Sequence, residues 1–439
     1  MKKCLLSLAA LFGMAFTVSA QEVKFEEYDL SNGMHVILHQ DNGAPVVTTA
    51  VLYHVGGKDE KENRTGFSHF FEHLLFEGTK NIGRGEWFSI VAAAGGTNNA
   101  YTTDDYTYYY EIFPSNQTQL GLWMEAERML HPVINKEGIK TQNEVVKEEK
   151  RANFDNSPYA YYQDEVKKNI FDLHPYKRAS IGSMEDLDAA SLEEFIAFRN
   201  QYYVPNNAVL VVAGDIDIDQ SKQWIENYFS RIPKGPPVER IAITEVPIEK
   251  ERKATYYDKN IQIPALITAY RSPEVTNRDA KVLEIISTYL SDGKSSRLYK
   301  RMVDKEKIAL EVAAFNLNQE DYGVYIILGL PLGENTFDDL LLAINEEIVK
   351  IQEGLISKRD YQKIQNKFET EYVNANASVE GIANSLAEYY AFYRDTKLIN
   401  KEIDIYRSIT REDIRRVARK YLNPQQRLIL DYLPTSEKQ

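Results

Sequence analysis

The sequence predicts an α+β fold built from two homologous domains, each an antiparallel-rich sheet with helices packed on one side. Three observations lead to this prediction. The chain has 439 residues, which is more than one ordinary domain needs. Both halves show the same order of expected elements. Prolines and charges cluster without periodicity between residues 232 and 249, which is typical of a linker.

The two halves repeat one series of elements. The first is expected to contain a strand, a helix, a pair of strands, a long amphipathic helical region and a closing helix and strand, in the ranges 45–53, 66–76, 97–113, 117–152 and 192–212. The second repeats this series in the ranges 263–270, 280–290, 309–330, 337–372 and 411–432. We therefore expect a duplicated architecture.

The first 20 residues are typical of a signal peptide. Lys2 and Lys3 precede an apolar run, residues 5–18, and Val18-Ser19-Ala20 is a small-residue cleavage site. The run is too short to cross a bilayer, and no later stretch approaches the length required. We expect an exported protein, periplasmic or secreted, with no membrane span.

Charge and cysteine content exclude several classes. With 52 Lys and Arg against 65 Asp and Glu, the formal charge is −13, so we expect no nucleic acid partner, because phosphate contacts need clustered cations. Cys4 is the one cysteine and lies within the signal peptide. Any metal site in the mature chain must therefore use His, Asp and Glu.

These features divide the chain into four segments. They are a signal peptide (1–20), an N-terminal domain (21–235), a linker (236–249) and a C-terminal homologous domain (250–439). All seven histidines lie in the first half. The second domain is therefore expected to lack the metal site.

The N-terminal domain contains the motif His69-Phe70-Phe71-Glu72-His73. Residues three and four apart share one helix face, so both imidazoles and the carboxylate of Glu72 face the same way. Two neutral histidines can bind zinc, and a carboxylate that is not a ligand can act as a base. The order His-x-x-Glu-His is the inverzincin motif of zinc peptidases, so residues 21–235 are expected to form a zinc-binding peptidase domain.

A catalytic zinc needs a third protein ligand and an open position for water. Carboxylates of the predicted helix 142–151 are the best candidates, and Val145 and Val146 are expected to form the apolar face of that helix. The residues alone do not choose among Glu144, Glu148 and Glu149.

The segment from Gly66 to Thr79 resembles the active-site segment of the pitrilysin family, which includes the insulin-degrading enzyme and the mitochondrial processing peptidase. The resemblance implies a third ligand about 76 residues beyond His73, which selects Glu149. It also implies a supporting glutamate seven residues before the third ligand, where this chain has Gln142. An amide there can still form hydrogen bonds but carries no charge.

The segment from Gly95 to Tyr108 is similar to the strand that lies beside the metal in this family. The resemblance implies that Asn99, Ala100, Tyr101 and Thr102 bind peptide substrates by adding a strand to the sheet edge. The implied activity is that of a zinc metalloendopeptidase. A non-catalytic binding or structural subunit on the same scaffold is the alternative, and a zinc hydrolase acting on other substrates is a third possibility.

The second half departs from the family pattern. Active members place an Arg and a Tyr seven residues apart near the substrate, but Val303 and Leu310 stand at the matching positions. Arg297, Tyr299 and Arg301 lie nearby at other spacings. We expect a homologous partner subunit that carries the Arg/Tyr pair, in a heterodimer, with a homodimer as the alternative.

Overall fold

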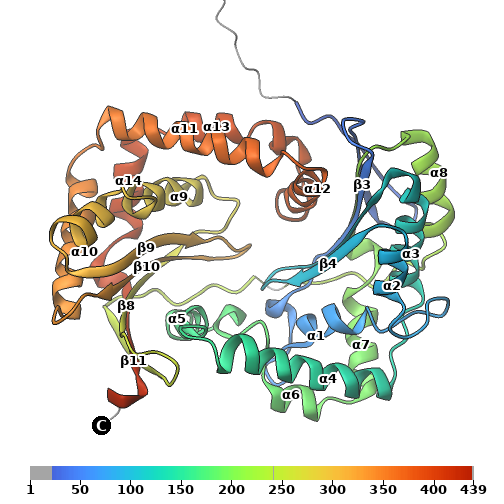
Figure 1. Ribbon diagram of the computed structural model, residues 1–439, viewed down its shortest axis with the longest axis horizontal. Coiled ribbons are helices and arrows are strands. Elements are labelled where there is room, and N and C mark those ends of the chain that lie inside the picture. The colour runs from blue at the N-terminus through green and yellow to red at the C-terminus, as the bar shows by residue number, and fades with distance from the viewer. Residues whose placement is uncertain (1–21, 241, 438–439) are drawn as a thin grey trace, which may run out of the picture.

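The computed structural model describes residues 22–240 and 242–437. The predicted signal peptide, residues 1–20, lies outside the described residues. Figure 1 shows the two halves side by side, the first in blue to green and the second in yellow to red. No helix in the described part of the chain combines the length and apolar character needed to cross a membrane.

Within the described residues, the first half forms one six-stranded sheet. Its strands are β1 (Glu26–Asp29), β2 (His35–Gln40), β3 (Val46–Tyr53), β4 (Thr97–Thr102), β5 (Thr107–Pro114) and β6 (Ala208–Gly214). Their order is β1-β2-β6-β3-β5-β4. The β2–β6 pair is parallel and the other neighbouring pairs are antiparallel.

The second half forms a five-stranded sheet over its described residues. Its strands are β7 (Arg252–Asp258), β8 (Ala265–Ser272), β9 (Ala309–Leu317), β10 (Gly323–Pro331) and β11 (Arg427–Pro434). The order is β7-β11-β8-β10-β9, with β7–β11 parallel. This matches β2-β6-β3-β5-β4 strand for strand, and the predicted fold of two homologous antiparallel-rich domains is confirmed.

The helices of the first half follow the predicted order, with others between them. They are α1 (Phe67–Leu74), α2 (Trp87–Ala93), α3 (Thr118–Leu130), α4 (Lys136–Lys150), α5 (Tyr162–Ile170), α6 (Met184–Ala189), α7 (Leu192–Tyr202) and α8 (Ile218–Phe229). The helical region predicted at 117–152 is two helices, because Pro132 follows α3 and cannot donate a backbone N–H. Asn135 then begins α4 by accepting the N–H of Gly138 (2.8 Å).

The helices of the second half are α9 (Arg278–Ser291), α10 (Phe337–Glu353), α11 (Lys358–Ala375), α12 (Val379–Glu388), α13 (Glu402–Ser408) and α14 (Arg411–Tyr421). The region predicted at 337–372 is likewise two helices. Gly354 adopts an extended conformation after α10, and Ser357 caps α11. Ser and Gly at these positions are common helix boundaries.

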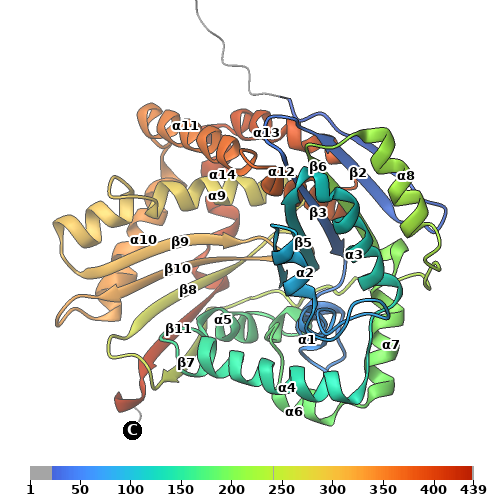
Figure 2. The same cartoon turned by 45° about the vertical axis from the view of Figure 1, so that its right-hand side comes forward.

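One helix of each half packs against the sheet of the other half. On α12, Ile382 and Leu386 are buried in one cluster with Leu52 of β3 and Val211 of β6. On the other side, Val166 of α5 is buried in a cluster with strands of the second sheet. Figures 1 and 2 show both helices against the sheets of the opposite half. Because a sheet face must be buried, each half completes the core of the other.

A buried ion-pair network joins the tips of the two hairpins. Lys58 Nζ lies 3.1 Å from Asp105 Oδ1 in the β4–β5 turn, and 2.6 and 3.0 Å from Glu320 Oε2 and Asp321 Oδ2 in the β9–β10 turn. Glu320 Oε2 also accepts from His54 Nε2 (2.7 Å). Burial alone would raise the pKa of Glu320, but His54 and Lys58 lower it to about 2. The network fixes how the halves meet.

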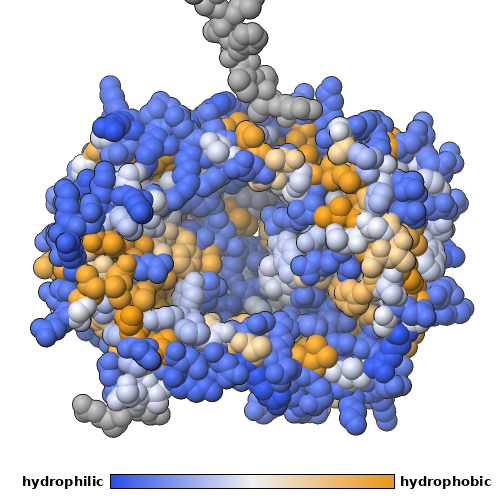
Figure 3. Space-filling model, viewed as in Figure 1, coloured by the Kyte–Doolittle hydropathy of each residue, from blue (hydrophilic) through white to orange (hydrophobic). Residues whose placement is uncertain are grey.

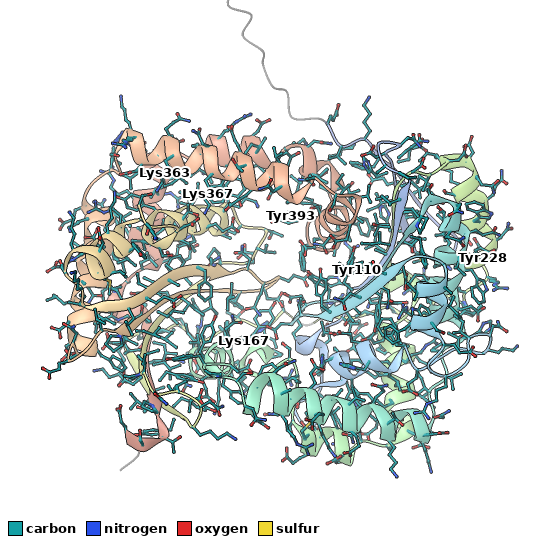
Figure 4. All side chains as sticks on the ribbon, in the orientation of Figure 1. Tyr110, Lys167, Tyr228, Lys363, Lys367 and Tyr393 are labelled. Atoms are coloured by element: carbon teal, nitrogen blue, oxygen red, sulfur yellow. The ribbon has the colours of Figure 1, made fainter. Side chains whose placement is uncertain are left out.

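The space between the halves is hollow (Figure 3). It is a cavity of about 980 Å³ whose lining includes residues of α5, α12 and β9 and of the turn that follows β4. Lys167 and Tyr393 both line it and lie on opposite sides (Figure 4). The edge strand β4 therefore ends at the rim of an interior space.

Candidate metal centre

The sequence of α1 buries one of its faces and leaves the other accessible. Its buried apolar residues recur at helical spacing and pack in the first-half core: Phe67, Phe70, Phe71 and Leu74. The polar residues of the motif, His69, Glu72 and His73, lie on the other side. The side chains of His69 and His73 are 13% and 22% exposed, which leaves both imidazoles open to a ligand.

Helix α4 contributes the third group. Val146 is fully buried in the core, and Glu149, one turn later, lies on the same side of the helix. The expectation that Val145 shares this apolar face is wrong: Val145 is exposed. Neighbouring helical residues point about 100° apart, and on α4 that step turns Val145 away from the core that buries Val146.

The other two candidate carboxylates lie on the solvent side of α4. Glu144 is paired with Lys147 and Glu148 with Arg151, and both acidic side chains are more than half exposed. The structure thus brings Glu149 to the histidines and leaves Glu144 and Glu148 in solvent.

Three ligand atoms converge at this point. One atom each from His69, His73 and Glu149 lies within 4.8 Å of the others. Glu149 Oε2 is 3.0 Å from His73 Nε2 and 3.5 Å from His69 Nε2. The two imidazoles hold the pKa of the Glu149 carboxyl well below its usual range. The carboxylate is therefore ready to bind a cation at neutral pH.

The donor set fits zinc. Tetrahedral ligands at about 2.0–2.1 Å from zinc lie roughly 3.3 Å from one another, which is close to the separations between Glu149 and the two histidines. Glu149 Oε2 is buried and forms no well-aligned hydrogen bond. A buried carboxylate oxygen without such a partner is costly, and a metal ion would satisfy it.

Glu72, on the same helix as His69 and His73, forms its hydrogen bond with Thr102. Thr102, the last residue of β4, donates its hydroxyl to Glu72 Oε2 (2.7 Å). The general-base candidate and the edge strand are therefore in direct contact. The family resemblance implies a peptide-binding role for Thr102, and nothing in the spacing indicated its bond to Glu72.

The other predicted peptide-binding residues lie along β4, which is the terminal strand of its sheet. Ala100 is buried in the core shared with α1. Tyr101 faces the opposite side and donates to Asn384 of α12 (2.6 Å). Asn99 is exposed and opposite Tyr110 of β5. β4 thus has one face on the metal-site helix and the other on the second half.

Gln142 contacts the segment that follows α1. Its Nε2 donates to Glu77 Oε1 (2.6 Å), and Glu77 also accepts from Arg84 Nε (2.5 Å). The predicted supporting residue is therefore linked to the chain three residues beyond the end of α1.

The positions where the family pattern places Arg and Tyr are apolar in this structure. Val303 is partly buried against the second core, and Leu310 is 44% exposed at the start of β9. Arg297 is paired with Glu347 on α10 (3.0 Å), and Arg301 is paired with Glu346 on the same helix (2.6 Å). Both nearby arginines are engaged with their own domain.

Glu60 is a buried residue near the site that the sequence did not indicate. Glu60 accepts the backbone N–H groups of Gly66 and Ser68, each at 2.7 Å, at the start of α1. Burial raises the pKa of Glu60 to about 8, against the effect of these hydrogen bonds. A carboxylate outside the helix gives no local capping pattern, so the sequence offered no signal for it.

Two family models match consecutive parts of the chain. Residues 35–183 match "Insulinase (Peptidase family M16)", and residues 189–368 match "Peptidase M16 inactive domain". The matches together extend through both halves. The chain belongs to the insulinase family of peptidases, M16, which confirms the resemblance drawn from the motif.

Named relatives agree with this assignment. The zinc protease PqqE of Helicobacter pylori is 28% identical over 395 residues, which cover 88% of each chain. A probable mitochondrial-processing peptidase subunit beta of Arabidopsis thaliana is 22% identical over 407 residues, covering 90% of this chain and 75% of its own.

A solved structure of a protease from Helicobacter pylori superposes with a TM-score of 0.87 at 26% identity, covering 94% of this chain and 100% of that one. The fold is therefore that of the M16 peptidases. The family and the names of its members support a peptidase function.

Proposed function

We propose that this chain is a zinc-dependent endopeptidase that hydrolyses peptides or unfolded segments, with His69, His73 and Glu149 as zinc ligands. The convergence of these three side chains, beside a carboxylate that is not a ligand, carries the proposal. The zinc protease names of the relatives agree with it.

In this proposal Glu72 is the general base. A zinc ion held by the three ligands would lower the pKa of a bound water and polarise the scissile carbonyl. Glu72 accepts the proton of the attacking water and delivers it to the leaving amine. The Thr102 hydroxyl, 2.7 Å from Glu72 Oε2, restricts where that carboxylate can point.

The substrate is proposed to bind β4. A terminal strand presents backbone donors and acceptors on its free side, and an extended peptide can pair with them regardless of its sequence. A folded protein has no free extended segment to offer. The site therefore favours peptides and unfolded segments, which enter the space between the halves.

We also propose that the chain is the zinc-carrying subunit of a two-subunit enzyme. The support is that Val303 and Leu310 occupy the Arg and Tyr positions, while Arg297 and Arg301 are paired with carboxylates of α10. Groups that stabilise the transition state must then come from another chain. A homologous subunit that carries the Arg/Tyr pair would supply them.

Export to the periplasm or beyond the cell is proposed from residues 1–20 alone. The n-region, apolar run and small-residue site in this segment are the pattern of a cleaved signal. Cell fractionation, with terminal sequencing of the purified protein, tests it. A protein that retains Met1 in the cytoplasm would contradict it.

The central test combines metal analysis with peptide cleavage. The purified chain, alone and with a co-expressed homologous subunit, is assayed against unstructured peptides before and after chelation. We expect stoichiometric zinc and chelator-sensitive cleavage. Glu72→Gln should keep the zinc and lose about 10²- to 10⁴-fold in kcat.

Matched variants identify the third ligand. Glu149→Gln should lose zinc, whereas Glu148→Gln, an exposed neighbour on the same helix, should retain it. Full activity of the chain alone as a homodimer would overturn the two-subunit arrangement. Stoichiometric zinc with no cleavage in either arrangement would favour the non-catalytic binding subunit instead.

A further inference from the structure

Glu60 is a buried carboxylate that the proposed chemistry does not use. The residue is only 6% exposed. Its two oxygens accept separate backbone N–H groups in the first turn of α1: Oε2 from Gly66 and Oε1 from Ser68, both at 2.7 Å. Ser68 immediately precedes His69.

Helix α1 has no capping side chain of its own. The residue at its N-terminus is Gly66, in the left-handed region (φ 86°). A side chain there would also meet the carbonyl oxygen of Ile181, since an added Cβ would lie 2.7 Å from it. Glycine is therefore required at this position, and the amides that a Ser or Asp cap would satisfy need an acceptor from elsewhere. Glu60 is that acceptor.

The opposite end of α1 is held as well. Fully buried Arg128 directs Nη1 toward the carbonyl of Leu75 (3.5 Å), and Tyr109 donates to the carbonyl of Phe71 (2.8 Å). The positive charge of Arg128 at the C-terminus also matches the helix dipole. Of these contacts, those of Glu60 are made to the first turn of α1, which contains His69.

The position of this turn decides where the ligands point. A rotation of α1 by a single residue swings each side chain through about 100°. Glu149 is on α4, so its distance to His69 and His73 depends on how α1 is set against that helix.

We propose that Glu60 is a positioning residue that fixes the first turn of α1 and thereby sets His69 and His73 opposite Glu149. This inference rests on the proposed zinc site. Groups that orient metal ligands from outside the coordination shell are worth about 10- to 100-fold in metal affinity. We assign Glu60 an effect of that size, exerted through the helix backbone.

Glu60→Gln tests this with little change in shape. The amide retains one acceptor and turns an N–H₂ donor toward a backbone donor. Glu62→Gln is the matched control, because Glu62 is exposed and two residues away and undergoes the same carboxyl-to-amide change. Zinc affinity is measured by competition with a chromophoric chelator, and the thermal midpoint of the metal-free protein is measured separately.

We expect Glu60→Gln to weaken zinc binding by about 10- to 100-fold and Glu62→Gln to leave it unchanged. A merely structural role would lower the metal-free thermal midpoint and leave zinc affinity at the wild-type value, and that result overturns the inference. Equal losses in both variants overturn it too, since the effect would then not be specific to Glu60.

Glu60→Asp covers the case in which Glu60→Gln does not fold. It keeps the carboxyl group but shortens the side chain by one methylene, so it should also bind zinc more weakly than the wild type. Wild-type affinity in Glu60→Asp overturns the inference. Absence of zinc binding by the wild-type chain overturns the proposed function itself, whereas a wild-type chain that binds zinc no better than Glu60→Gln overturns the role of Glu60 alone.

Discussion

The two halves of this protein place different side chains between corresponding elements. In the first half, α1, the edge strand β4 and α4 surround His69, His73 and Glu149. In the second half, the matching elements α9, β9 and α11 surround a cavity of about 590 Å³ lined by hydroxyl and carboxylate groups, among them Ser287, Ser291 and Glu371. The duplicated scaffold has kept these elements, and among the described residues the His/Glu donor set is found in one copy.

The two edge strands differ in a second way. On β9, Ser291 of α9 both accepts from the backbone N–H of Ala314 (2.7 Å) and donates to its carbonyl (3.1 Å). On β4, the side chain of Thr102 instead donates to Glu72. A serine therefore occupies edge groups in the second half that a peptide strand would otherwise use. The two copies therefore differ in the helix residues that face the edge strand.

The largest predicted effect comes from removing a donor from the first half, which makes it resemble the second. His69→Ala should remove a ligand, and zinc, and with it cleavage, should be lost. Ser287→Ala on α9 is the counterpart, and it should leave the zinc content unchanged. Metal analysis of the purified variants decides this, and stoichiometric zinc in His69→Ala would contradict the ligand assignment.

A medium effect is expected where the halves meet. The folded-state pKa of Glu320 is lowered from 4.5 to about 2, so its contribution to stability is complete above the unfolded pKa and disappears as pH falls through the folded pKa. This shift corresponds to roughly 3 kcal/mol.

Glu320→Gln should therefore destabilise the protein by roughly that amount at about pH 7, and the difference from the wild type should shrink as the pH approaches about 2. Urea unfolding of both proteins over this range measures it. Asp321, which is 43% exposed in its side chain, offers Asp321→Asn as a milder comparison. A difference that is constant with pH would show that the ion pairs are not its source.

The smallest effect is expected at the edge of β9. Ser291→Ala leaves the N–H and the carbonyl of Ala314 without their side-chain partner, at a cost of about 1 kcal/mol in the free energy of unfolding. Denaturant unfolding at neutral pH measures it. Zinc content should not change. No loss of stability would mean that water replaces the hydroxyl freely at this edge.

Much of the fold follows from local patterns. The β-branched runs that became β3 and β8 and the helical spacing of α1 and α9 depend on residues near one another in sequence, so their type was predictable. Helices α5 and α12 were not foreseen as partners of the opposite sheets. Their role depends on a packing between halves that no local pattern encodes.

The sequence by itself determined the face of α1 that carries His69, Glu72 and His73, because helical periodicity is a local property. It also determined that a second set of elements would repeat the first. Helical composition left three carboxylates of α4 open, the family resemblance selected Glu149, and the tertiary structure brings that residue to the histidines. Tertiary structure alone decided that Thr102 contacts Glu72 and that Glu60 accepts backbone N–H groups at the start of α1. Each of these contacts joins residues that lie apart in the sequence. The packing of the core sets the distance between them in space, and spacing along the chain does not encode that distance.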